Sequence, residues 1–223
     1  MLHFRVTGES QPVTVRAAAV VDATGRASAF ARRLGLRRTA FDGLISVSTR
    51  ALPRGSAAGE ALVESAADGW WFSALTGSGE LSVSWFTESA LLRLPDRSLA
   101  TLEARLQATT HTAARVAKLL PGAFEWRPAR TDRLEVFGGD GWLSVGDAAL
   151  ACDPLGSQGL LRALQSAAMA SELIVRDRTY TVKNLSAYRQ FQIDYLQRFL
   201  QERHSFYAME HRWPEARFWR RVQ

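Results

Sequence analysis

Four short segments between Asp42 and Glu88 constrain the fold of this chain more than any other feature. They are LISVSTRAL, ALVESA, GWWFSALT and ELSVSWFTE, and turn-forming sequences such as LPRGSAAG and TGSG separate them. Apolar and polar residues alternate within the segments, which is typical of strands with one buried face. Segments that follow one another through short turns tend to pair as neighbours. The region therefore predicts one antiparallel sheet.

The chain before this sheet predicts a hairpin, a strand and a short helix. Apolar and polar residues alternate over 2–6 and again over 13–15, and Gly8-Glu9-Ser10 between them has turn chemistry, so a hairpin is expected. The run AAAVVDATG that follows is nearly all apolar, which indicates a strand buried on both faces. Ser28 to Leu34 then predicts a short helix.

The chain after the sheet alternates between helices and strands. Leucines and small residues recur at three- and four-residue steps behind Pro95-Asp96, which predicts a helix from Ser98 to Leu120, closed by Pro121-Gly122. A strand is expected from Asp132 to Phe137. The segment GDGWLSVGDAALACDPLGSQGLLRALQSAAMASELI then predicts a strand, a loop and a helix rich in small residues. A long amphipathic helix follows, with Asn184 as its expected cap.

Composition excludes several classes of protein. Apolar side chains make up 47% of the chain, and no apolar stretch is long enough for a membrane helix or arranged as a secretion signal. The single cysteine, Cys152, rules out an internal disulfide, and no histidine spacing suggests a metal site. The net charge of +6 comes from scattered arginines, which argues against nucleic acid as a partner. We expect a cytoplasmic chain without a metal or a membrane partner.

The chemistry of the chain centres on Gly146-Asp147, which is followed by six residues, Pro154 and the helix-opening sequence GSQGL. An aspartate at the tip of a strand can accept hydrogen bonds from ligand hydroxyls, and glycine lets a ligand approach the backbone. The unpaired N–H groups that open a helix stabilise negative charge. The candidate binding residues of this stretch are Gly146, Asp147, Pro154, Ser157, Gln158, Gly159 and Leu160.

This stretch resembles the FAD-dependent monooxygenases of the para-hydroxybenzoate hydroxylase type, together with flavin-dependent halogenases and geranylgeranyl-reductase-like enzymes. The resemblance implies that Asp147 binds a hydroxyl of the FAD ribityl chain. It implies that the amides of Gly159 and Leu160 hold the O2 side of the flavin ring, and that Pro154 lies near the carbon that binds oxygen. No acid or base side chain is required, so no catalytic residue is assigned.

A second match is VVDATGRASAFARRLG, which is similar to the Asp-x-x-Gly-Arg-x-Ser stretch of the same superfamily. In that superfamily the stretch meets the cofactor, so the resemblance adds Asp22, Gly25 and Arg26 to the expected FAD-binding residues. The order of the remaining segments looks most like the halogenase-related branch, which includes flavoproteins that hydroxylate residues of other proteins.

Two departures from the superfamily pattern limit the function. Halogenases carry Gly-Trp-x-Trp-x-Ile-Pro at the aromatic strand, whereas residues 69–75 are GWWFSAL, which disfavours halogenation. The chain also contains no G-x-G-x-x-G, the motif of the unit that binds the FAD pyrophosphate. That unit should precede Met1, so we expect a truncated product, a misplaced start or half of a split enzyme.

The expected fold is α+β, with four segments. Residues 1–40 are a partial FAD-binding domain, 41–135 a substrate domain with an antiparallel sheet, 136–175 the flavin-contacting strand, loop and helix, and 176–223 a C-terminal helical region. The expected activity is that of an FAD-dependent monooxygenase that acts through a flavin hydroperoxide on an aromatic or peptide-borne substrate. A missing N-terminal half supplied separately is a possible partner.

Three alternatives stay open at this point. They are a geranylgeranyl-reductase-like enzyme, a halogenase-related flavoprotein and a non-catalytic fragment or binding module. The aromatic residues of the sheet could line a substrate cavity, but aromatic residues in strands more often belong to the core, and we expect that role for Trp70, Trp71, Phe72 and Trp85.

Overall fold

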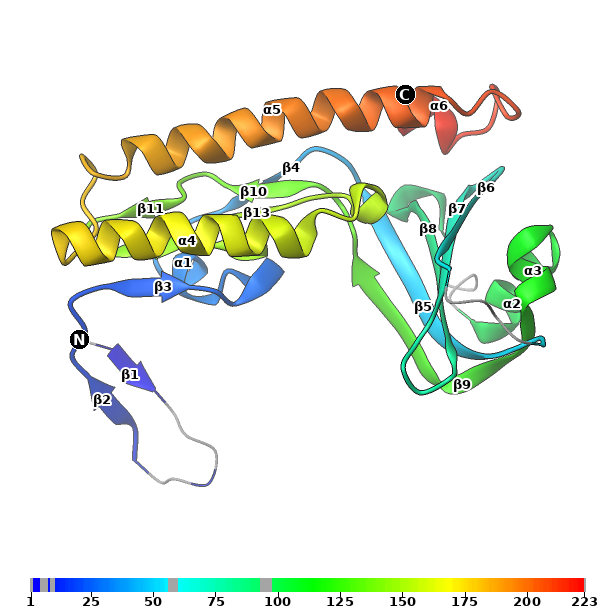
Figure 1. Ribbon diagram of the computed structural model, residues 1–223, viewed down its shortest axis with the longest axis horizontal. Coiled ribbons are helices and arrows are strands. Elements are labelled where there is room, and N and C mark those ends of the chain that lie inside the picture. Colours follow the sequence, from blue (N-terminus) through cyan, green and yellow to red (C-terminus); the bar gives the residue numbers. More distant parts are fainter. Residues whose placement is uncertain (1, 5–7, 9–10, 56–59, 93–97, 223) are drawn as a thin grey trace. The chain divides into compact units, whose positions relative to one another are not determined.

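The computed structural model describes residues 2–4, 8, 11–55, 60–92 and 98–222 (Figure 1). The chain folds as two compact units, each built from two stretches of sequence. The first unit contains residues 1–39 and 132–199, and the second contains residues 40–131 and 200–223. Mixed helices and antiparallel sheets confirm the α+β class. The functions that we assign to the four sequence segments stay predictions.

The first unit begins with the predicted hairpin. Strands β1 (Leu2–Phe4) and β2 (Val13–Val15) pair antiparallel, which confirms it. Gly8 between them has a φ of +94°, a backbone angle that favours glycine, while residues 9 and 10 of the expected turn lie outside the described residues. Helix α1 (Ala29–Arg33) likewise confirms the short helix expected from Ser28 to Leu34.

The strand expected in AAAVVDATG forms, but the prediction about its burial is wrong. Strand β3 (Val20–Asp22) is not buried on both faces, because Val21 is 45% exposed while Asp22 is buried. Only one face of this small sheet is packed among the described residues, so alternate side chains point outward. The strand also has a parallel neighbour. It pairs with β12 (Trp142–Ser144), which in turn pairs with β11 (Gly138–Gly139).

A second small sheet of the first unit follows the order β13 (Leu150–Ala151), β10 (Asp132–Leu134) and β4 (Arg38–Ala40). The strand expected from Asp132 to Phe137 is therefore shorter than predicted. It ends where the Leu134 amide bonds to the carbonyl of Ala149, and the chain then leaves this sheet to enter β11.

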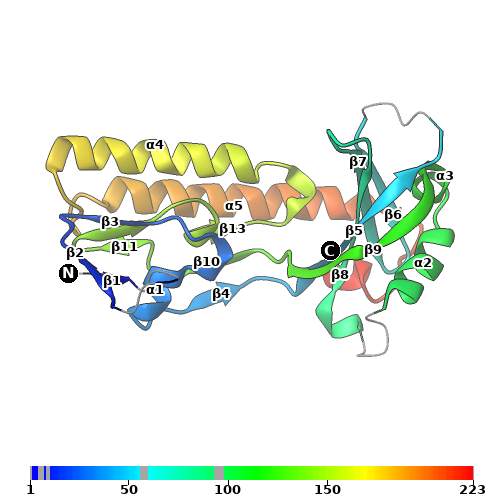
Figure 2. The ribbon, with the colours of Figure 1, turned by 90° about the horizontal axis from the view of Figure 1, so that it is seen from below.

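Two long helices follow these strands in the chain, and the first of them and most of the second belong to the first unit. They are α4 (Gly159–Asp177) and α5 (Ser186–Ala208), which run side by side in Figures 1 and 2. The Tyr188 hydroxyl of α5 donates to the carbonyl of Ser144 at 2.6 Å, which ties this helix to β12. Asn184 does not cap α5 as predicted, because its side-chain oxygen accepts from the amide of Thr181, ahead of the helix.

The second unit contains the predicted antiparallel sheet. Its strands are β5 (Leu44–Pro53), β6 (Leu62–Ala66), β7 (Gly69–Leu75), β8 (Leu81–Glu88) and β9 (Val116–Pro128), in the order β6-β7-β8-β5-β9. Trp71 and Trp85 are buried on one face with Leu102 and Leu106 of α2 (Leu99–Gln107). Trp70 is buried on the other face, where its Nε1 donates to the Tyr207 hydroxyl at 2.9 Å. The tryptophans are thus core residues, as expected, and Phe72 beside them is half-buried.

The predicted helix from Ser98 to Leu120 is wrong beyond its first half. Helix α2 ends at Gln107, a short helix α3 (His111–Arg115) follows, and the chain then enters β9. The carboxylate of Glu64 on β6 accepts hydrogen bonds from the amides of Thr110, His111 and Thr112, which starts α3 as a separate helix. Pro95-Asp96, the expected entry to the helix, lies outside the described residues.

The region after α3 is a strand because a partner strand is available to it. Val116 and Leu119 of β9 pair with Pro53 and Ala51 of β5, so their apolar side chains enter the sheet core. Pro121-Gly122 lies within the strand, next to an irregularity in this pairing. An apolar spacing of three and four residues is compatible with a helix or with a strand, and tertiary pairing decides between the two.

The C-terminal end of the second unit packs against β6. Helix α6 (Trp219–Val222) follows α5, and the Nε1 of Trp219 donates to the carbonyl of Ala66 at 2.9 Å. The ring of Trp219 also lies near those of Tyr207, Trp213 and Phe218. The aromatic residues of the tail therefore form a cluster at the edge of the sheet.

Candidate functional site

The loop after β12 is held on both sides by helix α4. The amide of Gly146 donates to the Ser166 hydroxyl at 2.8 Å, and its carbonyl accepts from the Arg162 guanidinium at 2.8 Å. Gly146 has a φ of +55°, and a Cβ at this position would lie 3.2 Å from the Cβ of Ala163. A glycine is therefore required here by both backbone angle and space. The consequence is a turn whose position is set by three residues of one helix.

Asp147 follows at the tip of this turn, with its carboxylate open to the surface. Its side chain is 41% exposed, and its Oδ2 lies 3.8 Å from the Nε of Arg26. Its backbone carbonyl accepts from Arg38 at 3.1 Å. The backbone is thus anchored while the carboxylate stays accessible, which is the arrangement a hydroxyl-bearing ligand needs.

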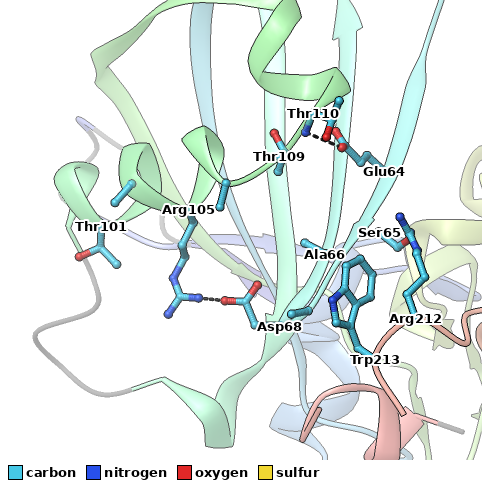
Figure 3. Close-up of a pocket in the computed structure, with 13 residues that line it drawn as sticks. Glu64, Ser65, Ala66, Asp68, Thr101, Arg105, Thr109, Thr110, Arg212 and Trp213 are labelled. Atoms are coloured by element: carbon cyan, nitrogen blue, oxygen red, sulfur yellow. Dashed lines mark hydrogen bonds and ion pairs between the residues drawn. The ribbon is translucent and has the colours of Figure 1, made fainter. Parts of the chain in front are cut away.

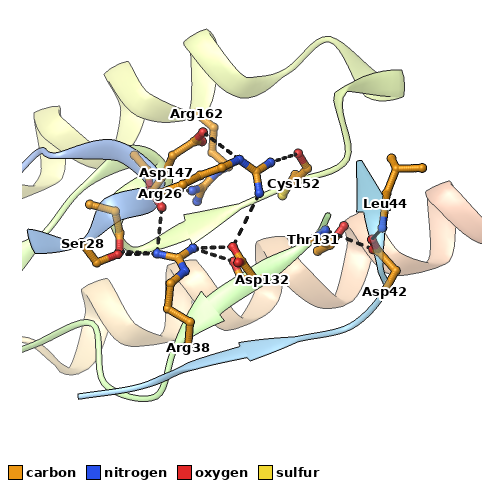
Figure 4. A network of polar contacts seen from close by, with 12 residues as sticks. Arg26, Ser28, Arg38, Asp42, Leu44, Thr131, Asp132, Asp147, Cys152 and Arg162 are labelled. Carbon is orange, nitrogen blue, oxygen red and sulfur yellow. Dashed lines mark hydrogen bonds and ion pairs between the residues drawn. The ribbon is translucent and has the colours of Figure 1, made fainter. Parts of the chain in front are cut away.

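Arg26 and Arg38 form a polar network that joins the segment VVDATGRASAFARRLG to the stretch that follows Gly146-Asp147 (Figure 4). Arg38 donates to the Ser28 hydroxyl at 2.5 Å and to the Asp132 carboxylate at 2.6 Å. Arg26 donates to the carbonyl of Cys152 at 3.0 Å, and its Nη1 lies 3.6 Å from the same Asp132 carboxylate. The Asp132 side chain is only 3% exposed, so this buried carboxylate is paired with two cations. The network holds Arg26 beside Asp147.

Asp22 has a structural role in this arrangement. It is buried, and its Oδ2 accepts from the amides of Phe30 and Ala31 at the start of α1, at 3.1 and 3.0 Å. Its Oδ1 accepts from the amide and the hydroxyl of Thr24. Both carboxylate oxygens are therefore engaged by the protein itself. Asp22 fixes the backbone that carries Gly25, which has a φ of +64°, and Arg26.

The loop from Pro154 to Leu160 ends in an open helix N-terminus. Pro154 begins a short 3₁₀ turn, and Ser157 has a φ of +51° before α4 starts at Gly159. No described side chain caps this end of α4: the oxygen of Gln158 accepts instead from the Tyr195 hydroxyl at 2.9 Å. A Cβ added to Gly159 would meet no atom within 4 Å, and the Leu160 side chain is 77% exposed. The first amides of a 19-residue helix are thus available to an anion.

Cys152 precedes this loop and carries a free thiol. Burial raises its pKa to about 12, which keeps the thiol protonated near neutral pH. Within the described ranges, no group of histidine, cysteine and acidic side chains could hold a metal ion.

The structure brings most of the predicted residues into one arrangement within the first unit. Gly146, Asp147 and Arg26 are linked through the contacts above, and the loop with Pro154, Ser157, Gln158, Gly159 and Leu160 leads into the helix that anchors Gly146. Sequence analysis missed Arg38, Asp132, Arg162 and Ser166. For the last two a signal existed, because residues four apart on the small-residue helix share one face.

Comparison with known proteins identifies the fold. No family model matches the chain. It is 29% identical over 213 residues to LodB of Marinomonas mediterranea, whose name gives it as an FAD-dependent oxidoreductase, covering 91% of this chain and 55% of LodB. The structure matches the flavin-dependent halogenase CmlS with a TM-score of 0.78 and 23% identity, over 96% of this chain and 41% of CmlS.

Two further solved structures match the fold of this chain. The myxobacterial chondrochloren halogenase CndH matches with a TM-score of 0.81 and 19% identity, over 96% of this chain and 52% of CndH. The peptidyl tryptophan dihydroxylase QhpG matches with a TM-score of 0.74 and 23% identity, over 100% of this chain and 53% of QhpG. This chain has a flavin monooxygenase-type fold. It spans about half the length of these relatives and corresponds to their C-terminal part.

In this flavoprotein fold the second unit carries a pocket of about 600 Å³ (Figure 3). Its lining includes Arg105 and Asp68, which pair with each other, and Glu64, whose carboxylate is occupied by the start of α3. Arg212 of the lining pairs with Glu210. The charged groups of the pocket are therefore matched by protein partners, and we assign it no ligand. Among the residues that the structure describes, no helix combines the length and hydropathy that a membrane span requires.

Proposed function

We propose that this chain binds the ribityl chain and ring of FAD and acts within an FAD-dependent oxidoreductase of the monooxygenase type. The observation that carries the proposal is the pair formed by an open carboxylate and an open helix N-terminus. The carboxylate of Asp147 is exposed at the tip of an anchored turn, and α4 begins without a side-chain cap. The names and titles of LodB, CmlS and CndH support a flavin as the ligand.

The described residues fit this part of the cofactor. Asp147 would accept a hydrogen bond from a ribityl hydroxyl, and the amides of Gly159 and Leu160 would donate to the O2 side of the ring. Gly159 leaves space at the backbone for a planar ring to approach, and Pro154 would border it. Arg26 stays beside Asp147 through its bonds to Asp132 and Cys152. The sequence contains no motif for the FAD pyrophosphate, so the proposal concerns the ribityl and ring portion.

A bound reduced flavin supplies the reaction with molecular oxygen that monooxygenases use. The residues of this chain would position the ring, stabilise negative charge on it and exclude water. We propose an aromatic or peptide-borne substrate, since QhpG is named for a peptidyl tryptophan. The sequence GWWFSAL at residues 69–75 continues to disfavour halogenation.

Titration of the purified chain with FAD tests the proposal directly. Binding is expected to quench flavin fluorescence, and Asp147→Ala is expected to raise the Kd for FAD by roughly 10- to 100-fold, the effect of one hydrogen bond to a charged group. Asp194→Ala, which removes an exposed carboxylate on α5, is the matched control and should leave the Kd unchanged. Unquenched FAD with the wild-type chain, or equal Kd values for wild type and Asp147→Ala, would refute the proposal.

The monooxygenase type requires a separate measurement. The FAD-loaded chain is reduced and exposed to ¹⁸O₂ in the presence of a tryptophan-containing peptide, and the peptide is analysed by mass spectrometry. Incorporation of ¹⁸O supports a monooxygenase. Oxidation of the flavin without label in the peptide would favour a reductase of the geranylgeranyl type or a different substrate class.

A further inference from the structure

Arg162 is a buried cation without an acidic partner. Its side chain is 1% exposed, and its guanidinium donates to the side-chain oxygen of Gln192 and to the carbonyl of Gly146, both at 2.8 Å. The guanidinium carbon Cζ lies over the Tyr195 ring, 5.2 Å from the ring centre. All of these partners are neutral. Within the described part of the chain, no carboxylate oxygen lies within 4 Å of this guanidinium, and its Nε has no hydrogen-bond partner.

The nearest acidic groups of the loop are engaged elsewhere. Asp147 is oriented toward Arg26, and Asp153 accepts from the amide of Leu155 at 2.9 Å. Two titratable groups affected by the charge of Arg162 are the buried hydroxyl of Tyr188, whose pKa burial raises, and the thiol of Cys152, whose pKa burial also raises. Neither carries a charge near neutral pH. The positive charge of Arg162 is therefore not neutralised by contact.

An unpaired charge in the interior is costly, and holding a loop does not by itself require one. A carbonyl such as that of Gly146 can be held by a neutral donor, as its amide is held by the neutral hydroxyl of Ser166. Removing a cation from water without a counter-charge costs several kcal/mol. That cost falls when an anion binds nearby, because charges interact strongly where the dielectric constant is low. The location of Arg162 in the first turn of α4 places this charge at the open helix end.

We propose that Arg162 is a positioning residue whose buried charge makes the site prefer the reduced, anionic flavin over the oxidised, neutral one. The inference rests on the proposed function and deepens it. The oxidised ring is neutral, whereas the reduced ring carries negative charge at its N1/O2 edge. Arg162 adds a full charge to the partial positive charge of the helix N-terminus, and both would stabilise negative charge on a flavin ring bound there.

The test measures the Kd of the chain for oxidised and for reduced FAD under anaerobic conditions. The ratio of the two constants is compared among wild type, Arg162→Met and Arg162→Lys. In Arg162→Met the preference for reduced FAD should fall by about tenfold, which corresponds to a decrease of about 30 mV in the two-electron potential of the bound flavin. Arg162→Lys retains the charge and should keep most of the preference.

Ser166→Ala separates charge from loop geometry. This variant removes the bond to the Gly146 amide without changing the net charge of the site. It should weaken both redox forms equally and leave the ratio unchanged. Circular dichroism of each variant verifies that it folds.

The outcomes separate an effect of the Arg162 charge from a role of Arg162 in holding the loop. An unchanged ratio in Arg162→Met, even with weaker binding of both forms, would show that Arg162 only holds the loop. Equal losses of preference in the Lys and Met variants would also overturn the proposal, because hydrogen-bond geometry rather than charge would then be responsible. A wild-type chain that binds neither form refutes the proposed function and this inference with it, and that result is distinct from intact binding with an unchanged ratio.

Discussion

At the residue scale, Gly146 meets three structural requirements of the candidate site: its backbone angle, its close packing and its two hydrogen bonds to α4. Its φ of +55° is a backbone angle that side chains disfavour, and the space where a Cβ would go is bounded by the Cβ of Ala163 at 3.2 Å. Its amide and carbonyl both bond to α4. A change at this residue therefore alters the turn that presents Asp147.

Gly146→Ala is expected to lower the free energy of unfolding by roughly 1–3 kcal/mol, from the positive φ and the close contact together. Urea denaturation measures the change. Gly77→Ala is the control, because Gly77 has no positive φ and a Cβ there would meet no atom within 4 Å. Equal stabilities of Gly146→Ala and wild type would show that the turn can relax, and the tight packing against α4 would then be unimportant.

At the scale of elements, the chain after α5 is tied to the edge strand β6 by polar contacts. The Ser65 hydroxyl of β6 donates to Glu210 at 2.5 Å, and Arg212 donates to the same carboxylate at 2.6 Å. Trp219 adds its bond to the carbonyl of Ala66. The hydrogen bond from Arg212, followed by that from Ser65, holds the pKa of Glu210 at about 2, below its usual value of 4.5.

This lowered pKa makes the contact dependent on pH. A carboxylate with a folded-state pKa below its unfolded value stabilises the protein above pH 4.5, and the stabilisation is lost as the pH falls from 4.5 toward 2. Glu210→Gln is expected to reduce stability at pH 7 by about 1 kcal/mol at most, because Arg212 is largely exposed and solvent screens the pair.

Urea denaturation at pH 7 and at pH 3 measures this effect. The difference between wild type and Glu210→Gln should shrink at the lower pH. Glu202→Gln, an exposed position on α5, serves as the control for removing a negative charge. A difference between wild type and Glu210→Gln that stays constant from pH 7 to pH 3 would contradict the assignment.

At the scale of the whole molecule, the candidate site lies within the first unit although its residues come from two segments that are far apart in the sequence. Segments 22–38 and 132–162 supply the Asp22, Arg26 and Arg38 side chains and the Asp147 turn. Binding a ligand to these segments stabilises the folded state of the unit that they form.

Hydrogen exchange should therefore locate FAD on the chain. At a free FAD concentration of 100 times Kd, the amides of residues 144–162 and 22–31 should gain protection equivalent to about 2.7 kcal/mol. Residues 101–120 of the second unit are the internal reference and should exchange as before. Protection at 101–120 in place of 144–162 would move the ligand site to the pocket of the second unit.

Local sequence patterns sufficed for much of this fold and for part of the site. The hairpin, α1, the four strands from Asp42 to Glu88 and the helix after the Gly-Asp loop follow from alternation, helical spacing and turn chemistry. Gly146 and Asp147 could be identified because their spacing to Pro154 and to the helix start is local. All of these signals involve residues within one element or one turn.

The sequence by itself determined the elements whose stability comes from neighbours along the chain, together with the loop that carries Asp147. Only the tertiary structure decided that residues 116–120 belong to a strand, since their apolar spacing suits a helix equally well until β5 offers a partner. It also decided the pairing of Arg38 with Asp132, 94 residues away, and the burial of Arg162. These interactions depend on distances between segments remote in sequence, and the periodicity of any one segment carries no information about them.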